Sequence, residues 1–259
     1  MLRRAAVAVS VAALVLALPS SAAPSKEELV ALLAEIDARQ RNTGDYKALC
    51  YLEQKEKDKP DLVRELLVFR RDADDKVMFL FTKPKSEEGK GYLRLEKNLW
   101  SYDPSTGKWD RTTERERIGG TSSRRSDFDE SRLAEEFEAA FVDEAKLGAY
   151  AALHLKLTAK PGVDVAYPVV ELWIDKATHN VLKRQDYALS GRLMRTALYP
   201  KWQKLASPTK GADVYFPAQI HIYDEVEKST STLVLFKQVD LTPLDANLFT
   251  KAWLESKSR

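Results

Sequence analysis

The pattern of apolar positions begins with one helix-like stretch close to the N-terminus. Between Leu29 and Ile36, apolar residues recur at the three- and four-residue spacing of a helix that buries one face. Ser25 and Glu28 form a capping-box pair at its start, since a Ser and a Glu three residues later can satisfy each other's backbone N–H groups. The pattern therefore predicts an amphipathic helix over residues 25–42.

After residue 44 the apolar spacing changes to a period of two, which is typical of β-strands. Residues 66–69 and 77–81 are apolar on both faces, so this part of the sheet is expected to be covered on both sides. Short turns join roughly eleven or twelve segments, which predicts an antiparallel and strongly curved sheet. The candidate strands are residues 45–57, 61–71, 76–83, 90–97, 98–104, 108–117, 151–160, 167–176, 180–189, 191–200, 214–226 and 229–241.

The strand pattern is interrupted in the middle of the chain, over residues 127–141. Asp127 is a candidate N-cap residue for a helix. Leu133, Phe137 and Phe141 then repeat every four residues. This spacing predicts a second helix with an apolar stripe that faces inward.

An aromatic cluster is predicted in the stretch GYLRLEKNLWSYDPSTGKWDR at residues 91–111. Trp100 and Tyr102 have the same parity, so they project from one face of the sheet. The residues 103–107 form a turn, and Trp109 returns on the next strand, close enough to pair. These aromatic side chains can form either ordinary core or the wall of a ligand cavity, with both interpretations open at this point.

The N-terminus has the organisation of a secretory signal peptide over residues 1–23. Arg3 and Arg4 precede an uncharged apolar stretch, which a zone of small residues follows. The alternative is an uncleaved membrane anchor, but the apolar run of about 14 residues is shorter than the roughly 20 that span a bilayer. We expect cleavage, a periplasmic location and a single domain over residues 24–259.

The charge distribution argues against nucleic acid as a partner. The chain carries 41 Lys and Arg residues against 39 Asp and Glu residues, and the two Arg residues of the signal peptide account for the difference. The charges are interspersed, whereas a nucleic-acid binder is expected to show a basic excess or a basic face. Cys50 is the only cysteine, so no internal disulfide can form and stability must come from the core.

The sequence contains no arrangement of residues that argues for catalysis or cofactor binding. There is no G-x-S-x-G motif and no P-loop. His154, His179 and His221 lie singly on different predicted strands or turns, so no metal site is expected. We therefore expect neither an enzyme nor a bound cofactor, although an unrecognised hydrolase remains an alternative.

Three stretches resemble the bacterial outer-membrane lipoprotein-sorting protein family, which includes relatives of the periplasmic carrier LolA. They are the aromatic stretch at residues 91–111, the loop and helix region that begins SSRRSDFDESRLAEEF, and the C-terminal VDLTPLDANLFTKAWLESKSR. The matching positions are Gly91, Tyr92, Leu93, Asn98, Leu99, Trp100, Tyr102, Pro104, Ser126, Asp127, Phe128, Leu248, Phe249, Thr250 and Leu254. One departure is that the family's loop carries Met-Gly before Ser-Asp-Phe, where this chain has Arg124-Arg125.

The resemblance implies a mainly β, α+β fold: an incomplete, strongly curved antiparallel β-barrel whose concave face is closed by helices. It also implies an apolar cavity for acyl chains. Independently of the resemblance, Arg124 and Arg125 belong to the most basic patch of the sequence, so they are candidate contacts for a lipid headgroup at the rim of such a cavity. The alternative for these arginines is a solvated loop with ordinary ion pairs. The side chains expected to line the cavity are Phe79, Phe81, Trp100, Tyr102, Trp109, Leu133, Phe137, Phe141 and Trp173.

The function that these expectations favour is a monomeric periplasmic carrier of lipid or lipoprotein acyl chains. Its partners would be an acylated ligand and a membrane transporter or outer-membrane acceptor. The main alternative is an interaction or sensor protein of the same fold that binds a periplasmic protein without transferring lipid.

Overall fold

The computed structural model describes residues 23–41, 44–95, 98–112, 117–124, 127–128 and 131–258. Its helices are α1 (Lys26–Arg41), α2 (Leu133–Glu136) and α3 (Lys251–Lys257), with short 3-10 turns η1 (Ile118–Gly120) and η3 (Ala246–Leu248). Its strands are β1 (Asp45–Glu56), β2 (Leu62–Arg71), β3 (Lys76–Lys83), β4 (Gly91–Leu95), β5 (Asn98–Asp103), β6 (Lys108–Thr112), β7 (Phe137–Leu147), β8 (Tyr150–Ala159), β9 (Val169–Asp175), β10 (Val181–Tyr187), β11 (Leu193–Ser207), β12 (Ala212–Asp224) and β13 (Thr230–Asp240).

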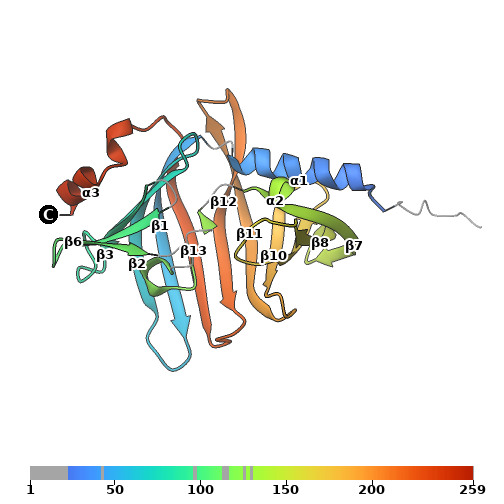
Figure 1. Ribbon diagram of the computed structural model, residues 1–259, viewed down its shortest axis with the longest axis horizontal. Helices are drawn as coiled ribbons and strands as arrows, with labels where there is room; N and C mark the ends of the chain where they lie inside the picture. Colours follow the sequence, from blue (N-terminus) through green and yellow to red (C-terminus); the bar gives the residue numbers. More distant parts are fainter. Residues whose placement is uncertain are drawn as a thin grey trace, which may run out of the picture.

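The strands form one antiparallel sheet that does not close into a barrel. Within the described part of the chain, its order is β6-β5-β4-β3-β2-β1-β13-β12-β11-β10-β9-β8-β7. The two meanders β1–β6 and β7–β13 are joined where β1 pairs with β13, so β6 and β7 are the free edges. The predicted antiparallel half-barrel is confirmed, and Figure 1 shows its curvature.

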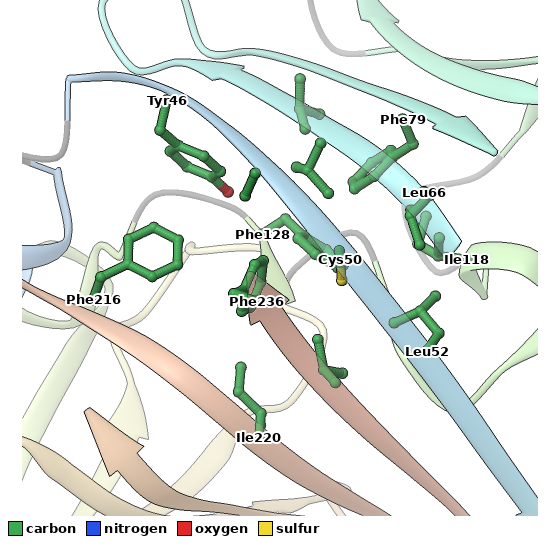
Figure 2. Packing of buried hydrophobic residues seen from close by; sticks show 14 of the residues in the cluster. Tyr46, Cys50, Leu52, Leu66, Phe79, Ile118, Phe128, Phe216, Ile220 and Phe236 are labelled. Carbon is green, nitrogen blue, oxygen red and sulfur yellow. The ribbon is translucent and has the colours of Figure 1, made fainter. Parts of the chain in front are cut away.

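The sheet curls around one face, which we call the inner face. In a flat sheet β3 and β13 would lie about 14 Å apart, because β2 and β1 separate them. Instead the ring of Phe128 lies 4.8 Å from that of Phe79 on β3 and 5.9 Å from that of Phe236 on β13 (Figure 2). A single side chain can reach both strands only if the sheet bends toward it.

The inner face carries two apolar clusters under two different covers. Strands β1–β3, β12 and β13 supply the first cluster, which Ile118 and Phe128 cover from above (Figure 2). These two residues belong to what we call the inner segment, residues 117–124 and 127–128, in the connection between the edge strands. Strands β7–β10 supply the second cluster, which α1 covers. Tyr199 on β11 packs against both clusters, so the two form one continuous apolar surface.

Helix α1 forms and docks as its sequence predicts. The backbone N–H of Ser25 donates to Glu28 Oε2 at 2.7 Å and that of Glu28 donates to Ser25 Oγ at 3.2 Å, which is the predicted capping box. Near its other end, buried Asp37 accepts hydrogen bonds from the backbone N–H groups of Leu133 at 2.8 Å and Ala134 at 2.7 Å. Asp37 thereby caps α2 and ties it to α1. The four buried apolar residues of α1 are Leu29, Leu32, Leu33 and Ile36.

The opposite, outer face of β2–β4 is covered by η3 and α3. Leu254 of α3 is fully buried in this third cluster. Gly91 is required beside it, because a Cβ there would meet the backbone oxygen of Phe79 at 2.5 Å and Leu254 Cδ1 at 2.7 Å. The ring of Trp253 packs edge-on against Phe69 at 5.4 Å. The expectation that β2 and β3 are covered on both sides is therefore confirmed.

The predicted second helix over residues 127–141 is wrong for most of its length. Among the described residues of this range, Leu133–Glu136 form one α-helical turn, and Phe137 begins strand β7, which pairs with β8 along its length. Residues four apart lie on the same side of a strand as well as of a helix. Phe137 and Phe141 therefore satisfy both periods, and pairing with β8 selects the strand.

Candidate functional site

Five of the nine predicted cavity residues lie on the inner face. Phe79 and Phe81 of β3 belong to the cluster beneath the inner segment. Leu133, Phe137 and Phe141 belong to or pack against the cluster beneath α1. All five therefore lie on the face that an apolar ligand would contact. In this structure the inner segment and α1 cover that face.

The other four predicted residues face outward, which corrects the cavity assignment. Phe79 pairs with Tyr92 and Tyr92 with Ser101, so Ser101 shares the inner face, while Trp100 and Tyr102 point to the other side. The Trp109 indole donates to Glu255 of α3 at 2.6 Å, on that same outer side.

Strand pairing and the C-terminal helix account for this outward orientation. Lys251 of α3 lies 3.7 Å from the centroid of the Trp100 ring and 4.9 Å from that of Trp109. Trp173 also faces outward, stacked on His154 at 4.1 Å with Lys183 Nζ 3.9 Å from its ring centroid. The alternation of side chains along one strand predicts that Trp100 and Tyr102 share a face. It does not predict whether that face is the inner or the outer one.

A row of alternating charges crosses the inner face between the two apolar clusters. Asp127 of the inner segment pairs with Arg195 on β11, whose Nη1 lies 3.5 Å from Asp186 Oδ2 on β10. Arg184 Nε in turn donates to Asp186 Oδ1 at 2.6 Å. We call these four residues the charge row. Sequence analysis missed it, although Arg184, Asp186 and Arg195 occupy facing positions on two adjacent strands.

The charge row is deeply buried except at one end. The side chains of Asp127, Asp186 and Arg195 are 8%, 1% and 7% exposed, whereas that of Arg184 is 31% exposed. Burial acts to lower the pKa of Arg195, but the carboxylates of Asp127 and Asp186 outweigh it and raise that pKa. The pairing of Asp127 with Arg195 holds the inner segment to the sheet.

Some polar atoms of the row lack a partner. Asp186 Oδ2 and Arg195 Nε are buried and accept or donate no hydrogen bond within the described residues. Leaving a buried polar atom unpaired costs roughly 1–3 kcal/mol. These atoms of the charge row therefore lower the stability of the fold, which is not expected of a surface that forms only hydrophobic core.

Of the two predicted rim arginines, one can be placed. Arg124 lies with its guanidinium carbon 5.6 Å from the centroid of Tyr167, and its backbone N–H donates to Asp127 Oδ2 at 2.8 Å. It is close to the charge row, so a headgroup role for Arg124 stays a prediction. Arg125 lies outside the described residues.

Among the described residues, the inner segment and α1 pack over the two apolar clusters of the inner face. A hollow beside the charge row, bounded by Arg124, Arg195 and Asp224 among others, measures about 10 Å³, enough for at most one water molecule. A larger hollow of about 710 Å³ lies open on the outer face beside Tyr51. Its charged walls include Glu65 and Lys83, which pair with each other at 3.1 Å. Its lining also includes the apolar residues Val63 and Pro84.

Two further features of the described residues bear on function. No group of three or more His, Cys, Asp or Glu side chains among them could hold a metal ion. None of the described helices has the length and apolar character needed to cross a membrane.

Solved structures with the same fold define the class of protein. A LolA superfamily protein from Nitrosomonas europaea aligns with a TM-score of 0.70 at 19% identity, covering 86% of this chain and 97% of its own. A putative outer membrane lipoprotein-sorting protein domain from Vibrio parahaemolyticus gives 0.74 at 18% identity, covering 87% and 97%. A DUF1329 family protein from Desulfovibrio piger gives 0.76 at 15% identity, covering 88% and 98%. The chain therefore has the LolA-like fold, as its sequence motifs predicted.

The family itself follows from the sequence comparison. A family model described as "Uncharacterized protein" matches residues 73–256, and the chain belongs to that family. No curated protein matches the sequence.

Proposed function

We propose that the protein is a non-enzymatic periplasmic carrier that binds the acyl chains of a lipid or lipoprotein on the inner face of its half-barrel. The observation that carries the proposal is the inner face, whose two apolar clusters meet at Tyr199 and are covered by the inner segment and by α1 rather than by further strands. Burial of apolar surface contributes about 25 cal/mol per Å². An acyl chain that replaces a cover would bury the same apolar surface, so the cover and the acyl chain compete for it. The LolA-like fold supports the same function by analogy.

Binding requires that at least one cover moves. Ligand pockets measure about 300–1,000 Å³, whereas the inner hollow beside the charge row measures about 10 Å³. The inner segment is the simpler element to displace, because Ile118 and Phe128 are its large buried apolar side chains within the described residues. Helix α1 buries four such side chains and also holds α2 through Asp37.

A disulfide lock on the inner segment tests this opening directly. The backbone N–H of Ser122 donates to Thr232 Oγ1 on β13 at 2.9 Å, so cysteines at these two positions would lie close together. The Ser122→Cys, Thr232→Cys variant would be incubated, oxidised or reduced, with phospholipid vesicles, re-isolated and extracted for mass spectrometry. The native Cys50 is buried, and burial strongly raises the pKa of its thiol, so it should not interfere.

The expected result is lipid uptake by the reduced variant and little uptake by the oxidised one. The same protein in its two redox states is the matched control, since only the lock differs. Equal uptake in both states would show that the inner segment does not gate the site. Absence of lipid in both states and in the wild type, together with stoichiometric capture of one periplasmic protein, would favour the interaction-protein alternative.

A further inference from the structure

The exposed end of the charge row is built to accept an anion. Arg184 presents five N–H donors in a planar fork. Only its Nε donates a hydrogen bond, to Asp186, among the described residues. Its Nη groups therefore remain available, and 31% of the side chain is accessible.

One carboxylate contacts Arg184 among the described residues. Asp186 accepts from its Nε and is shared with Arg195, whereas Asp127 pairs with Arg195 and not with Arg184. Burial raises the pKa of Glu136 on α2, and Arg184 acts to lower it. An added oxyanion would therefore meet Nη groups that no carboxylate occupies.

Apolar residues flank the arginine on the same face. Arg184 pairs with Leu172 of β9 on one side and with Ala197 of β11 on the other, and both are buried. Tyr199 of β11 packs against both apolar clusters. A charged donor beside continuous apolar surface matches an amphiphile with an acidic head and an acyl tail.

We infer that Arg184 binds the oxyanion headgroup, phosphate or carboxylate, of an acyl ligand on the inner face. The inference rests on the proposed carrier function and adds the class of ligand. Arg184 fixes the head between the two clusters, and the acyl chain takes the place of one cover. An arginine suits this task because its fork can hold two oxygens of one headgroup at once.

The test measures which lipid the purified protein extracts from mixed vesicles. Phosphatidylcholine vesicles would carry equal small fractions of phosphatidylglycerol and of diacylglycerol with the same acyl chains. Protein re-isolated from them would be extracted, and the ratio of the two minor lipids measured by mass spectrometry. The variants are Arg184→Gln, Arg184→Lys, and Arg192→Gln as a matched control, since Arg192 is exposed in the β10–β11 turn.

Wild type and Arg192→Gln are expected to enrich phosphatidylglycerol over diacylglycerol. A charge-assisted hydrogen bond predicts that Arg184→Gln lowers that ratio about tenfold or more, with diacylglycerol recovery unchanged. Arg184→Lys keeps the charge without the fork, so an intermediate ratio is expected. If Arg184→Gln does not fold, the Lys variant and the wild-type ratio still decide the matter.

Other outcomes separate this inference from the carrier proposal. Equal recovery of both lipids by wild type would overturn the headgroup assignment and leave the carrier intact. Recovery of no lipid at all, phosphatidylcholine included, would overturn the carrier proposal and this inference together. Excess inorganic phosphate, but not sodium chloride of the same ionic strength, is expected to weaken the preference by competing for Arg184. A preference that phosphate leaves unchanged would overturn the headgroup assignment.

Discussion

Replacing Phe128 with alanine tests whether the inner segment is a cover that can detach or an integral part of the core. Phe128 of the inner segment and Phe79 of β3 are both buried, and their rings pack edge-on at 4.8 Å. Phe128→Ala and Phe79→Ala remove the same atoms from the two sides of one contact. They differ only in whether the residue belongs to the sheet or to the segment above it.

The expected losses of stability differ for a physical reason. Truncation of a core Phe costs about 3–5 kcal/mol of unfolding free energy, and Phe79→Ala should fall in that range. Phe128→Ala cannot cost more than the docking of the inner segment, because the segment can leave while the sheet stays folded. Ile118 and Phe128 contribute about 1.5–3 kcal/mol each to docking, but the entropic cost of ordering the segment offsets most of this gain. We therefore expect the segment to undock in Phe128→Ala and unfolding to lose only about 1–2 kcal/mol.

Urea unfolding followed by tryptophan fluorescence measures both losses. Phe128→Ala should also show a smaller dependence of unfolding free energy on urea, because its native state already exposes part of the inner face. An apolar dye should bind this variant more strongly than the wild type or Phe79→Ala. Equal losses for the two variants without extra dye binding would refute the idea of a detachable cover.

Four further predictions follow from named contacts. Asp37→Asn should lower unfolding free energy by about 1–2 kcal/mol, measured by thermal unfolding, because the charged cap of α2 is lost; no change would exclude the anchoring role. Glu136→Gln should stabilise the protein at neutral pH, because burial raises the folded-state pKa of this acid. The gain should vanish below the ordinary value of 4.5, so a pH-independent difference would contradict the cause. Leu254→Ala should cost about 2–5 kcal/mol in urea unfolding; a surface-like loss below that range would contradict its buried position. Trp100→Ala should leave lipid uptake unchanged, and reduced uptake by a folded variant would return Trp100 to the cavity wall.

The sequence predicted an element correctly where a single local pattern was enough to identify it. The spacing of apolar residues and the capping box placed α1, and alternation placed the strands. Helix α3 was missed, although Thr250 caps it and apolar Trp253 and Leu254 follow at helical spacing. With seven residues, α3 is too short for a helical period of apolar positions to be recognised.

The candidate site was harder to predict because it depends on which face each strand turns inward. Trp100 and Trp173 look like cavity residues from composition, yet pairing between strands points both outward. Arg184 and Asp186 alternate with polar neighbours and therefore resemble an exposed strand. Only the tertiary fold brings Asp127 from a distant loop to complete the charge row.

The most direct test of the carrier function is to identify what the protein holds when it is isolated. Protein purified from its native compartment without detergent would be extracted with organic solvent and the extract analysed by quantitative mass spectrometry. The account predicts a near-stoichiometric lipid or acylated peptide. An extract free of acyl chains, both on isolation and after incubation with membranes, would contradict it.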